Sequence, residues 1–87
     1  MPSVSILMPV YNAEPYLSEA IQSMLNQTYA DFELIILDDC STDRSAEVVQ
    51  TFSDARIVYH RNEVNSGLAN NLNTGLKLAT GKYIARM

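Results

Sequence analysis

Apolar and polar positions fall into blocks along the chain, and the blocks predict four short strands separated by three helices. The strand-like runs span Val4 to Met8, Glu33 to Leu37, Arg56 to His60 and Lys82 to Met87. Short apolar runs rich in β-branched residues are typical of strands. The first two runs are apolar almost throughout, which indicates strands covered by helices on both faces of a sheet.

Helical periodicity fills the first two intervals between these runs. From Pro15 to Gln27 the apolar residues recur at spacings of 3, 1, 3 and 1, which places them on one face of a helix. Proline suits the first turn, where its missing N–H would have no partner. A second helix is predicted from the candidate N-caps Ser41 to Asp43 through about Phe52. Its predicted inward positions are Ala46, Val49 and Phe52.

The third helix is predicted to begin at Asn65 to Gly67 and to carry an apolar stripe along one side. The stripe consists of Leu68, Leu72, Leu76 and Ala79. Gly81 stands where a left-handed C-cap belongs, since glycine adopts that conformation without a steric penalty. Asn73 and Gly75 are expected to shape this helix and let it pack closely rather than to contact a ligand.

Alternation of strand and helix predicts parallel strands joined by right-handed crossovers. We therefore expect an α/β fold, a Rossmann-like open parallel sheet in strand order 3-2-1-4 with flanking helices. The loop from Met8 to Pro15 contains no glycine, whereas a dinucleotide-binding loop needs glycines to approach a pyrophosphate. The fourth strand should be an exposed edge, so residues 82–87 are predicted to pair with a second copy as a homo-oligomer.

Composition and charge narrow the class of protein. Eighty-seven residues, 47% apolar and 18% charged, fit one globular domain. A net charge of −4 with only six Lys and Arg disfavours nucleic-acid binding, which needs clustered positive charge. No apolar run reaches the roughly 18–20 residues of a membrane span, so we expect a cytoplasmic location, with membrane association left open for parts beyond Met87. The single cysteine, Cys40, excludes an internal disulfide.

Two polar segments follow the first two predicted strands and form the candidate site. They are Pro9 to Asn12 and Asp38 to Asp43. In open parallel sheets ligands bind just outside the carboxyl ends of the strands, so the segments should line one cleft. The acid pair Asp38 and Asp39 could accept hydrogen bonds from the base or ribose of a nucleotide. In the alternative interpretation, one acid caps the turn and the other is solvated. Tyr11 could stack on a base or plug the cleft.

Five segments, in the same order, resemble family 2 glycosyltransferases, the nucleotide-sugar-dependent enzymes of the GT-A fold. The segments are Val4 to Asn12 with its P-V-Y-N turn, Ala20 to Tyr29, Phe32 to Asp43 with D-D-x-S-T-D, Asn65 to Gly75, and Thr80 to Met87. Together they cover essentially the whole chain. One such segment would be a weak signal, and the agreement of five is a strong one.

The resemblance implies a donor site within this chain. The implied nucleotide-binding residues are Pro9, Val10, Tyr11, Asp38, Asp39, Gly67 and Asn71. The first three would line the pocket for uracil or another base, and Asp39 would accept a hydrogen bond from the base. The start of the third helix, including Gly67 and Asn71, would approach the nucleotide.

The resemblance also implies the reaction. A sugar would pass from a nucleotide-diphosphate donor, by default a UDP-sugar with GDP- or dTDP-sugars as alternatives, to a hydroxyl of a glycan or lipid-linked acceptor, with inversion at the anomeric carbon. In the full-length protein a D-x-D motif directly after Met87 would hold Mn²⁺ or Mg²⁺ against the diphosphate. We expect residues 1–87 alone to bind no metal ion and to contain no catalytic residue.

The chain departs from the family pattern at two places. Cys40 replaces the usual glycine of D-D-G-S, which is costly if the backbone there needs a positive φ. The sequence ends at Met87, before D-x-D, so residues 1–87 are expected to be the N-terminal nucleotide-binding part of a GT-A domain and inactive alone. Two rivals stay open, a non-catalytic nucleotide-binding scaffold and an unrelated Rossmann-like phosphoacceptor or nucleotide domain. The latter should end its first strand in a buried acid, where this chain has Pro9.

Overall fold

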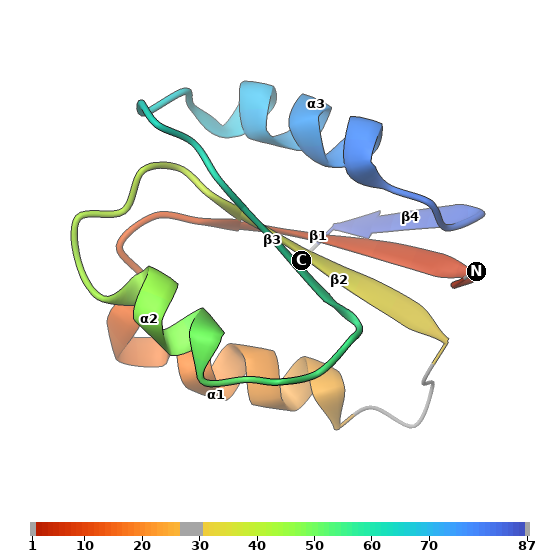
Figure 1. Cartoon of the computed structure of the whole chain (residues 1–87). Helices are drawn as coiled ribbons and strands as arrows, with labels where there is room; N and C mark the ends of the chain where they lie inside the picture. Colours follow the sequence, from red (N-terminus) through yellow and green to blue (C-terminus); the bar gives the residue numbers. More distant parts are fainter. Residues whose placement is uncertain (1, 27–30, 87) are drawn as a thin grey trace.

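The computed structural model of the protein describes residues 2–26 and 31–86, and strands and helices alternate along this part of the chain (Figure 1). The strands are β1 (Val4–Val10), β2 (Phe32–Asp38), β3 (Ile57–Arg61) and β4 (Tyr83–Arg86). The helices are α1 (Glu14–Leu25), α2 (Ser45–Gln50) and α3 (Leu68–Leu78). The predicted ends at Gln27 and Met87, and the Gln27 to Tyr29 part of the second motif, lie outside the described residues.

All strand pairs are parallel, and the sheet order is β3-β2-β1-β4. The predicted order 3-2-1-4 is thereby confirmed. Helices α1 and α2 cover one face of the sheet and α3 covers the other (Figure 1). Because successive side chains of a strand point to opposite faces, Ile6 and Met8 join the core beneath α1, whereas Leu7 joins the core beneath α3. All seven residues of β2 are buried, as its apolar sequence predicts.

Strand β4 is the exposed edge that the sequence predicts. Among the described residues it pairs only with β1, and all four of its residues are exposed. An unpaired strand edge is a template for another chain. Pairing of residues 82–87 with a second copy stays a prediction, which light scattering at high concentration would test.

Helix α3 packs through a face that includes only part of its apolar stripe. Of the predicted stripe, Leu72 and Ala79 pack on the core beneath α3, but Leu68 and Leu76 are about half exposed. The buried residues of α3 are Asn71 and Gly75. A Cβ on Gly75 would lie 2.8 Å from Leu37 Cδ1, so this glycine lets the helix approach the sheet closely. The expected packing role of Gly75 is confirmed, and the expected burial of Leu68 and Leu76 is wrong.

The turn between α3 and β4 corrects a second expectation. The C-cap residue of α3 is Ala79, which is extended with φ −66° and ψ 133°. Among the described glycines only Gly67 has a positive φ, so the predicted left-handed C-cap at Gly81 is wrong. Gly81 lies against β1 instead, where an added Cβ would be 2.6 Å from Ser5 N. A larger residue would therefore push the turn away from the strand.

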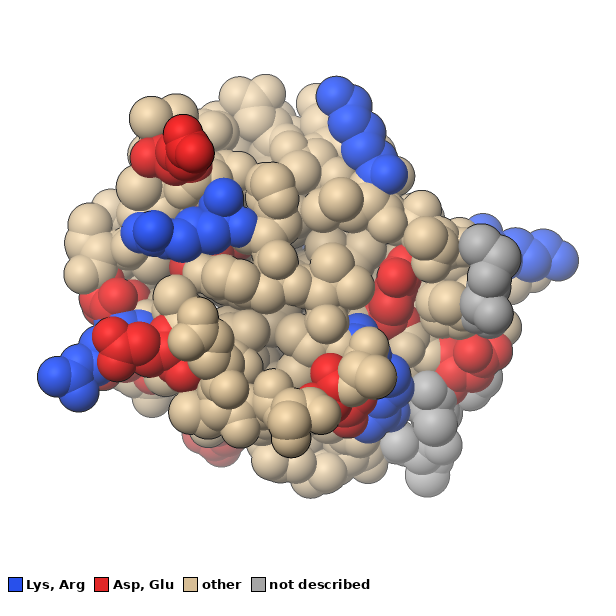
Figure 2. All heavy atoms as spheres, viewed as in Figure 1, with Lys and Arg blue, Asp and Glu red and all other residues tan. Residues whose placement is uncertain are grey.

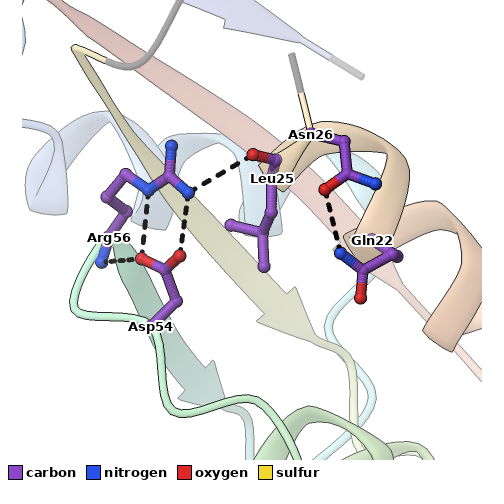
Figure 3. Close-up of polar contacts among 5 residues, drawn as sticks. All are labelled: Gln22, Leu25, Asn26, Asp54 and Arg56. Carbon is purple, nitrogen blue, oxygen red and sulfur yellow. Dashed lines mark hydrogen bonds and ion pairs between the residues drawn. The ribbon is translucent and has the colours of Figure 1, made fainter.

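Arg56 fixes the end of α1 at the amino end of the sheet (Figure 3). Its Nη2 donates to Asp54 Oδ2 at 2.8 Å and to the Leu25 carbonyl oxygen at 3.3 Å. The guanidinium lies over the Phe32 ring, 4.7 Å from the ring centroid. Hydrogen bonds from Arg56 lower the pKa of Asp54 to about 2, so the ion pair persists at neutral pH. The contact joins α1, β2 and the entry to β3.

The surface carries charges of both signs. On the face shown in Figure 2, Lys and Arg side chains are interspersed with Asp and Glu around the rim, and the middle is largely uncharged. This face therefore offers no basic patch of the kind that contacts a nucleic-acid backbone. None of the helices in the described part of the chain has the length and apolar character needed to cross a bilayer.

Glu33 is a nearly buried acid that holds the α3–β4 turn against the sheet. Its Oε2 accepts from Thr80 N at 2.7 Å, from Thr80 Oγ1 at 3.0 Å and from Ser5 Oγ at 2.5 Å. Ser5 Oγ in turn accepts from Gly81 N at 2.8 Å. Burial raises the pKa of the Glu33 carboxyl, but the hydrogen bonds from Ser5 and Thr80 outweigh it and hold this pKa below its ordinary value. The ionised form is therefore the one that the fold stabilises.

Glu33→Gln should destabilise the fold by about 1–3 kcal/mol at pH 7, because the hydrogen bonds to a charged acceptor are lost. The folded pKa lies below the unfolded value, so this stabilisation is present above the unfolded pKa and disappears as the pH falls through the folded pKa. Urea unfolding of both proteins at pH 7 and pH 3 measures the difference. The exposed Glu19→Gln is the control, and equal losses in the two variants, or a difference unchanged at pH 3, would contradict the assignment.

Candidate functional site

The loops that follow β1, β2 and β3 meet at the carboxyl edge of the sheet, on the left of Figure 1. Asn12, in the first loop, joins it to the second. Its Oδ1 accepts from Thr42 N at 2.8 Å and from Asp43 N at 3.3 Å, and its backbone N donates to Ser41 Oγ at 3.0 Å. The two polar segments that the sequence placed at this edge are therefore in direct contact.

Helices α1 and α2 share their N-terminal caps across these loops. The N-cap residue of α1, Ala13, makes no side-chain cap; instead Ser45 Oγ accepts from Ala13 N and Asp43 Oδ2 accepts from Glu14 N, both at 3.1 Å. Asp43 Oδ1 also accepts from Ser45 N at 2.9 Å. The N-cap residue of α2 is Arg44, which makes no side-chain cap, so the predicted N-cap at Ser41 to Asp43 is wrong by position, although Asp43 accepts from the first N–H of the helix. Shared caps satisfy N–H groups that a helix start leaves unpaired and fix both loops.

Within the described residues, two residues other than glycine adopt a positive φ, and both lie in these loops. They are Asn12 at 48° and Cys40 at 60°. Asparagine tolerates this left-handed region, whereas the Cβ of most residues costs about 1–2 kcal/mol there. The backbone at Cys40 therefore does need the positive φ that a glycine would adopt more easily.

Asp38 is fully buried at the end of β2 and caps the turn that follows. Its Oδ1 accepts from Ser41 N at 2.9 Å, and its Oδ2 accepts from Tyr59 Oη at 2.5 Å. Burial, together with this hydrogen bond, raises the pKa of the Tyr59 phenol. The acid pair is interpreted either as binding a nucleotide or as one turn cap and one solvated acid, and Asp38 is a turn cap. Its predicted part in nucleotide binding would be indirect, through the shape of the loop.

Asp39 is 6% exposed and joins three separate segments of the chain. Its Oδ1 accepts from Ser66 N at 2.6 Å and from Asn62 Nδ2 at 3.0 Å, and its Oδ2 accepts from Gly67 N at 3.0 Å. The backbone hydrogen bond from Ser66 is the largest cause that holds the pKa of Asp39 below its ordinary value. The carboxylate is therefore ionised at neutral pH. The interpretation of the second acid as merely solvated is wrong.

A pocket of about 170 Å³ opens between the β1–α1 loop and the start of α3. It is lined by Pro9, Val10, Tyr11, Asp39, Leu68 and Asn71. Five of the seven predicted nucleotide-binding residues meet here; Gly67 and Asp38 do not line the pocket, although Gly67 donates its N–H to Asp39. Pockets that enclose a whole drug-sized ligand measure about 300–1,000 Å³, so this one suits a part of a ligand, such as a single base.

The walls and the floor of this pocket differ in chemistry. Asp39 and Asn71 form a polar floor, and both are almost completely buried. Tyr11, which is 52% exposed, and Leu68 supply apolar walls. A second pocket of about 180 Å³ lies on the α1 side of β1 and shares Pro9, Val10 and Tyr11. Tyr11 therefore borders two openings and does not plug the cleft.

Two residues of the site escaped the sequence analysis: Tyr59, which supports Asp38, and Asn62, which contacts Asp39. Leu68, which the apolar stripe assigned to the core, lies in the helix start that the resemblance placed near the nucleotide, and it lines the pocket. The rule that singled out the residues after β1 and β2 would have found Asn62, because it directly follows β3. Its backbone N donates to the Asp38 carbonyl oxygen at 2.8 Å, which brings it to the same edge.

The described residues do not fit the divalent cation that the family resemblance implies. Within residues 2–26 and 31–86, no group of three or more His, Cys, Asp or Glu side chains is arranged to hold a metal ion. The oxygens of Asp38 and Asp39 accept hydrogen bonds from the protein itself.

The all-parallel sheet with helices on both faces defines the chain as an α/β protein of the Rossmann-like class, and the pocket lies at the carboxyl end of β1, the strand beside which the order reverses. The model of glycosyl transferase family 2 matches residues 5–87, and the chain belongs to this family. The unrelated Rossmann-like alternative is thereby excluded.

Relatives of known name agree with this assignment. The chain is 50% identical over 82 residues to UDP-Glc:alpha-D-GlcNAc-diphosphoundecaprenol beta-1,3-glucosyltransferase WfgD of Escherichia coli. The match covers 94% of the chain and 32% of the relative. The structure of S. aureus TarS 1-349 in complex with UDP-GlcNAc matches with a TM-score of 0.92 at 31% identity, covering 100% of the chain and 26% of TarS.

A second structure, the mannosyltransferase PcManGT from Pyrobaculum calidifontis in complex with GDP-Man and Mn²⁺, matches with a TM-score of 0.87 at 29% identity. The match covers 95% of the chain and 26% of the mannosyltransferase. The chain thus spans about a quarter to a third of the length of these relatives. It shares their GT-A, Rossmann-like architecture.

The two positive-φ residues should respond oppositely to glycine. Cys40→Gly should stabilise the fold by up to about 1 kcal/mol, because relief of the backbone strain exceeds the entropy that glycine adds to the unfolded chain. Asn12→Gly should destabilise it by about 1–2 kcal/mol, because the hydrogen bonds to the second loop are lost. Urea unfolding midpoints give both values. A loss of stability in Cys40→Gly as large as that in Asn12→Gly would contradict the strain at Cys40.

Proposed function

We propose that the full-length protein transfers a sugar from a nucleotide-diphosphate donor, a UDP-sugar by preference, to a hydroxyl of a glycan or lipid-linked acceptor. The acceptor oxygen forms a bond to the anomeric carbon while the bond from that carbon to the diphosphate breaks, and the configuration inverts. Membership of family 2 supports the reaction class. The complexes of TarS with UDP-GlcNAc and of PcManGT with GDP-Man support a nucleotide-sugar donor.

The pocket with the ionised Asp39 in its floor is the observation that carries this proposal. A uracil ring has apolar faces and a ring N–H on its edge. In our assignment Tyr11 and Leu68 contact the faces, Pro9 and Val10 border the ring, and Asp39 accepts from the N–H. Hydrogen bonds to an ionised acceptor are about twice as strong as neutral ones, so this contact would contribute most of the base affinity.

The other predicted nucleotide-binding residues support the contact between Asp39 and the base. Gly67 donates its backbone N–H to Asp39 Oδ2 and so holds the carboxylate that meets the base. Asn71 lies beside Asp39 in the pocket floor and would meet a polar atom of the base edge. Asp38 keeps the loop after β2 in shape through Ser41 and Tyr59.

We assign the diphosphate and its metal ion to residues beyond the described pocket. Strand β4 runs parallel to β1 with Leu7 opposite Arg86, so a chain that continues in this register passes Pro9 and Val10. Acidic residues at those positions would hold Mn²⁺ or Mg²⁺ beside the pocket, and the ion would neutralise charge on the departing diphosphate. The catalytic base and the acceptor site likewise belong to other parts of the protein in this proposal.

Asp39→Asn in the full-length protein should weaken uridine nucleotide binding about ten- to a hundredfold, the range expected when a hydrogen bond to a charged acceptor is lost. Cys40→Asn is the matched control, since asparagine tolerates a positive φ and Cys40 does not line the pocket. Calorimetric titration with UDP gives both affinities. Equal losses in the two variants, or a loss in neither, would contradict the role of Asp39. Binding of UDP without sugar transfer would favour the scaffold alternative.

A further inference from the structure

Asn62 lies beneath the pocket and contacts both polar residues of its floor. Its Nδ2 donates to Asp39 Oδ1 at 3.0 Å and also to Asn71 Oδ1. The backbone hydrogen bond to Asp38 anchors Asn62 to the end of β2. Asn62 is half-buried and does not line the pocket, so any effect on a ligand must pass through its two neighbours.

The direction of each hydrogen bond in this group follows from Asp39. An ionised carboxylate only accepts, so the group of Asn62 that faces it must be the amide NH₂. The group of Asn71 that meets this NH₂ must then be its oxygen. The NH₂ of Asn71 is thereby turned away from Asn62, in a residue that lines the pocket. An amide NH₂ carries two N–H donors, so Asn71 supplies the donor of the pocket floor.

We propose that Asn62 is a positioning residue that fixes the hydrogen-bond polarity of the pocket floor, with an acceptor at Asp39 and a donor at Asn71. This inference rests on the proposed function, because it concerns the base that binds there. Uracil presents a ring N–H beside a carbonyl oxygen and complements this floor. Cytosine presents a bare ring nitrogen beside an amino group, which is the reverse pattern. Asn62 therefore favours uridine over cytidine without touching either.

Loss of the Asn62 amide would remove one hydrogen bond from each floor residue. Asn71 Oδ1 would lose the donor that holds it, and Asn71 is almost completely buried, so water cannot easily replace that donor. Asp39 Oδ1 would keep only its hydrogen bond from Ser66 N among the contacts at that oxygen. Asp39 would stay held by the Ser66 and Gly67 N–H groups, but Asn71 could rotate, and the floor would no longer present one fixed pattern to the base.

Calorimetric titration of the full-length protein with uridine and with cytidine tests the inference. The wild type should prefer uridine, and Asn62→Ala should reduce this preference at least fivefold, mainly through weaker uridine binding. Asn73→Ala, at an exposed position of α3, is the control and should keep the preference. Asn62→Ser, whose hydroxyl can donate to only one of the two oxygens, replaces Asn62→Ala if that variant does not fold. A preference unchanged in the Asn62 variant would overturn the inference.

A double-mutant cycle separates positioning from a general structural effect. In the Asp39→Asn background, Asn62→Ala should change uridine affinity less than twofold, because the acceptor that Asn62 orients is gone. Fully additive losses would overturn the positioning role. A wild-type protein that binds neither uridine nor UDP would overturn the proposed function as well. If the wild type and the Asn62→Ala variant prefer uridine equally, only the role of Asn62 is overturned.

Discussion

The hydrogen bonds to the Asp39 carboxylate organise the whole carboxyl edge of the sheet. One side chain at the end of β2 accepts from Asn62 after β3 and from the Ser66 and Gly67 N–H groups before α3. These N–H groups belong to the helix start, which attracts negative charge. The position of α3, and with it the positions of Leu68 and Asn71, therefore depends on an acid that is distant in sequence. The hydrogen bonds to Asp39 therefore fix the floor and one wall of the pocket.

The opposite wall depends on the contact between the first two loops. Asn12 and the shared helix caps hold Tyr11 and its neighbours against the segment that begins at Asp38. Strain is stored at the same place, since Cys40 keeps a positive φ between Asp39 and Ser41. Such strain persists only where the surroundings fix the backbone. The pocket is thus built before any ligand arrives, which lowers the ordering cost of binding.

The sequence alone predicted the architecture well because the pattern is local and strong. Apolar runs at β1 and β2 and helical spacing between them are enough to imply a parallel sheet, and polar residues after the strands indicate its binding edge. The resemblance to family 2 glycosyltransferases also grouped Tyr11, Asp39 and Asn71, which the structure brings into one pocket. Their contact with a nucleotide, and the pairing of β4 with a second copy, stay predictions.

The expectations that failed all depend on contacts between distant residues. The face that α3 buries follows from the close approach at Gly75 and from the hydrogen bond of Asn71 to Asn62, neither of which an apolar stripe can reveal. Gly81 lacks a side chain because β1 passes beside it, not because of its φ. The position of Asn62 directly after β3 marks it as a residue of the binding edge, but a single polar residue after a strand is common and does not reveal its contacts with Asp39 and Asn71.

The central claim is that these 87 residues contain the base part of a donor site and not its diphosphate part. Titration calorimetry of the 87-residue chain with uridine and with UDP, each with and without Mn²⁺, tests it most directly. A net charge of −4 should repel a diphosphate, so we predict weak uridine binding, no tighter binding of UDP and no effect of Mn²⁺. Tight binding of UDP that appears only with Mn²⁺ would contradict the account, because the metal site would then lie within this chain.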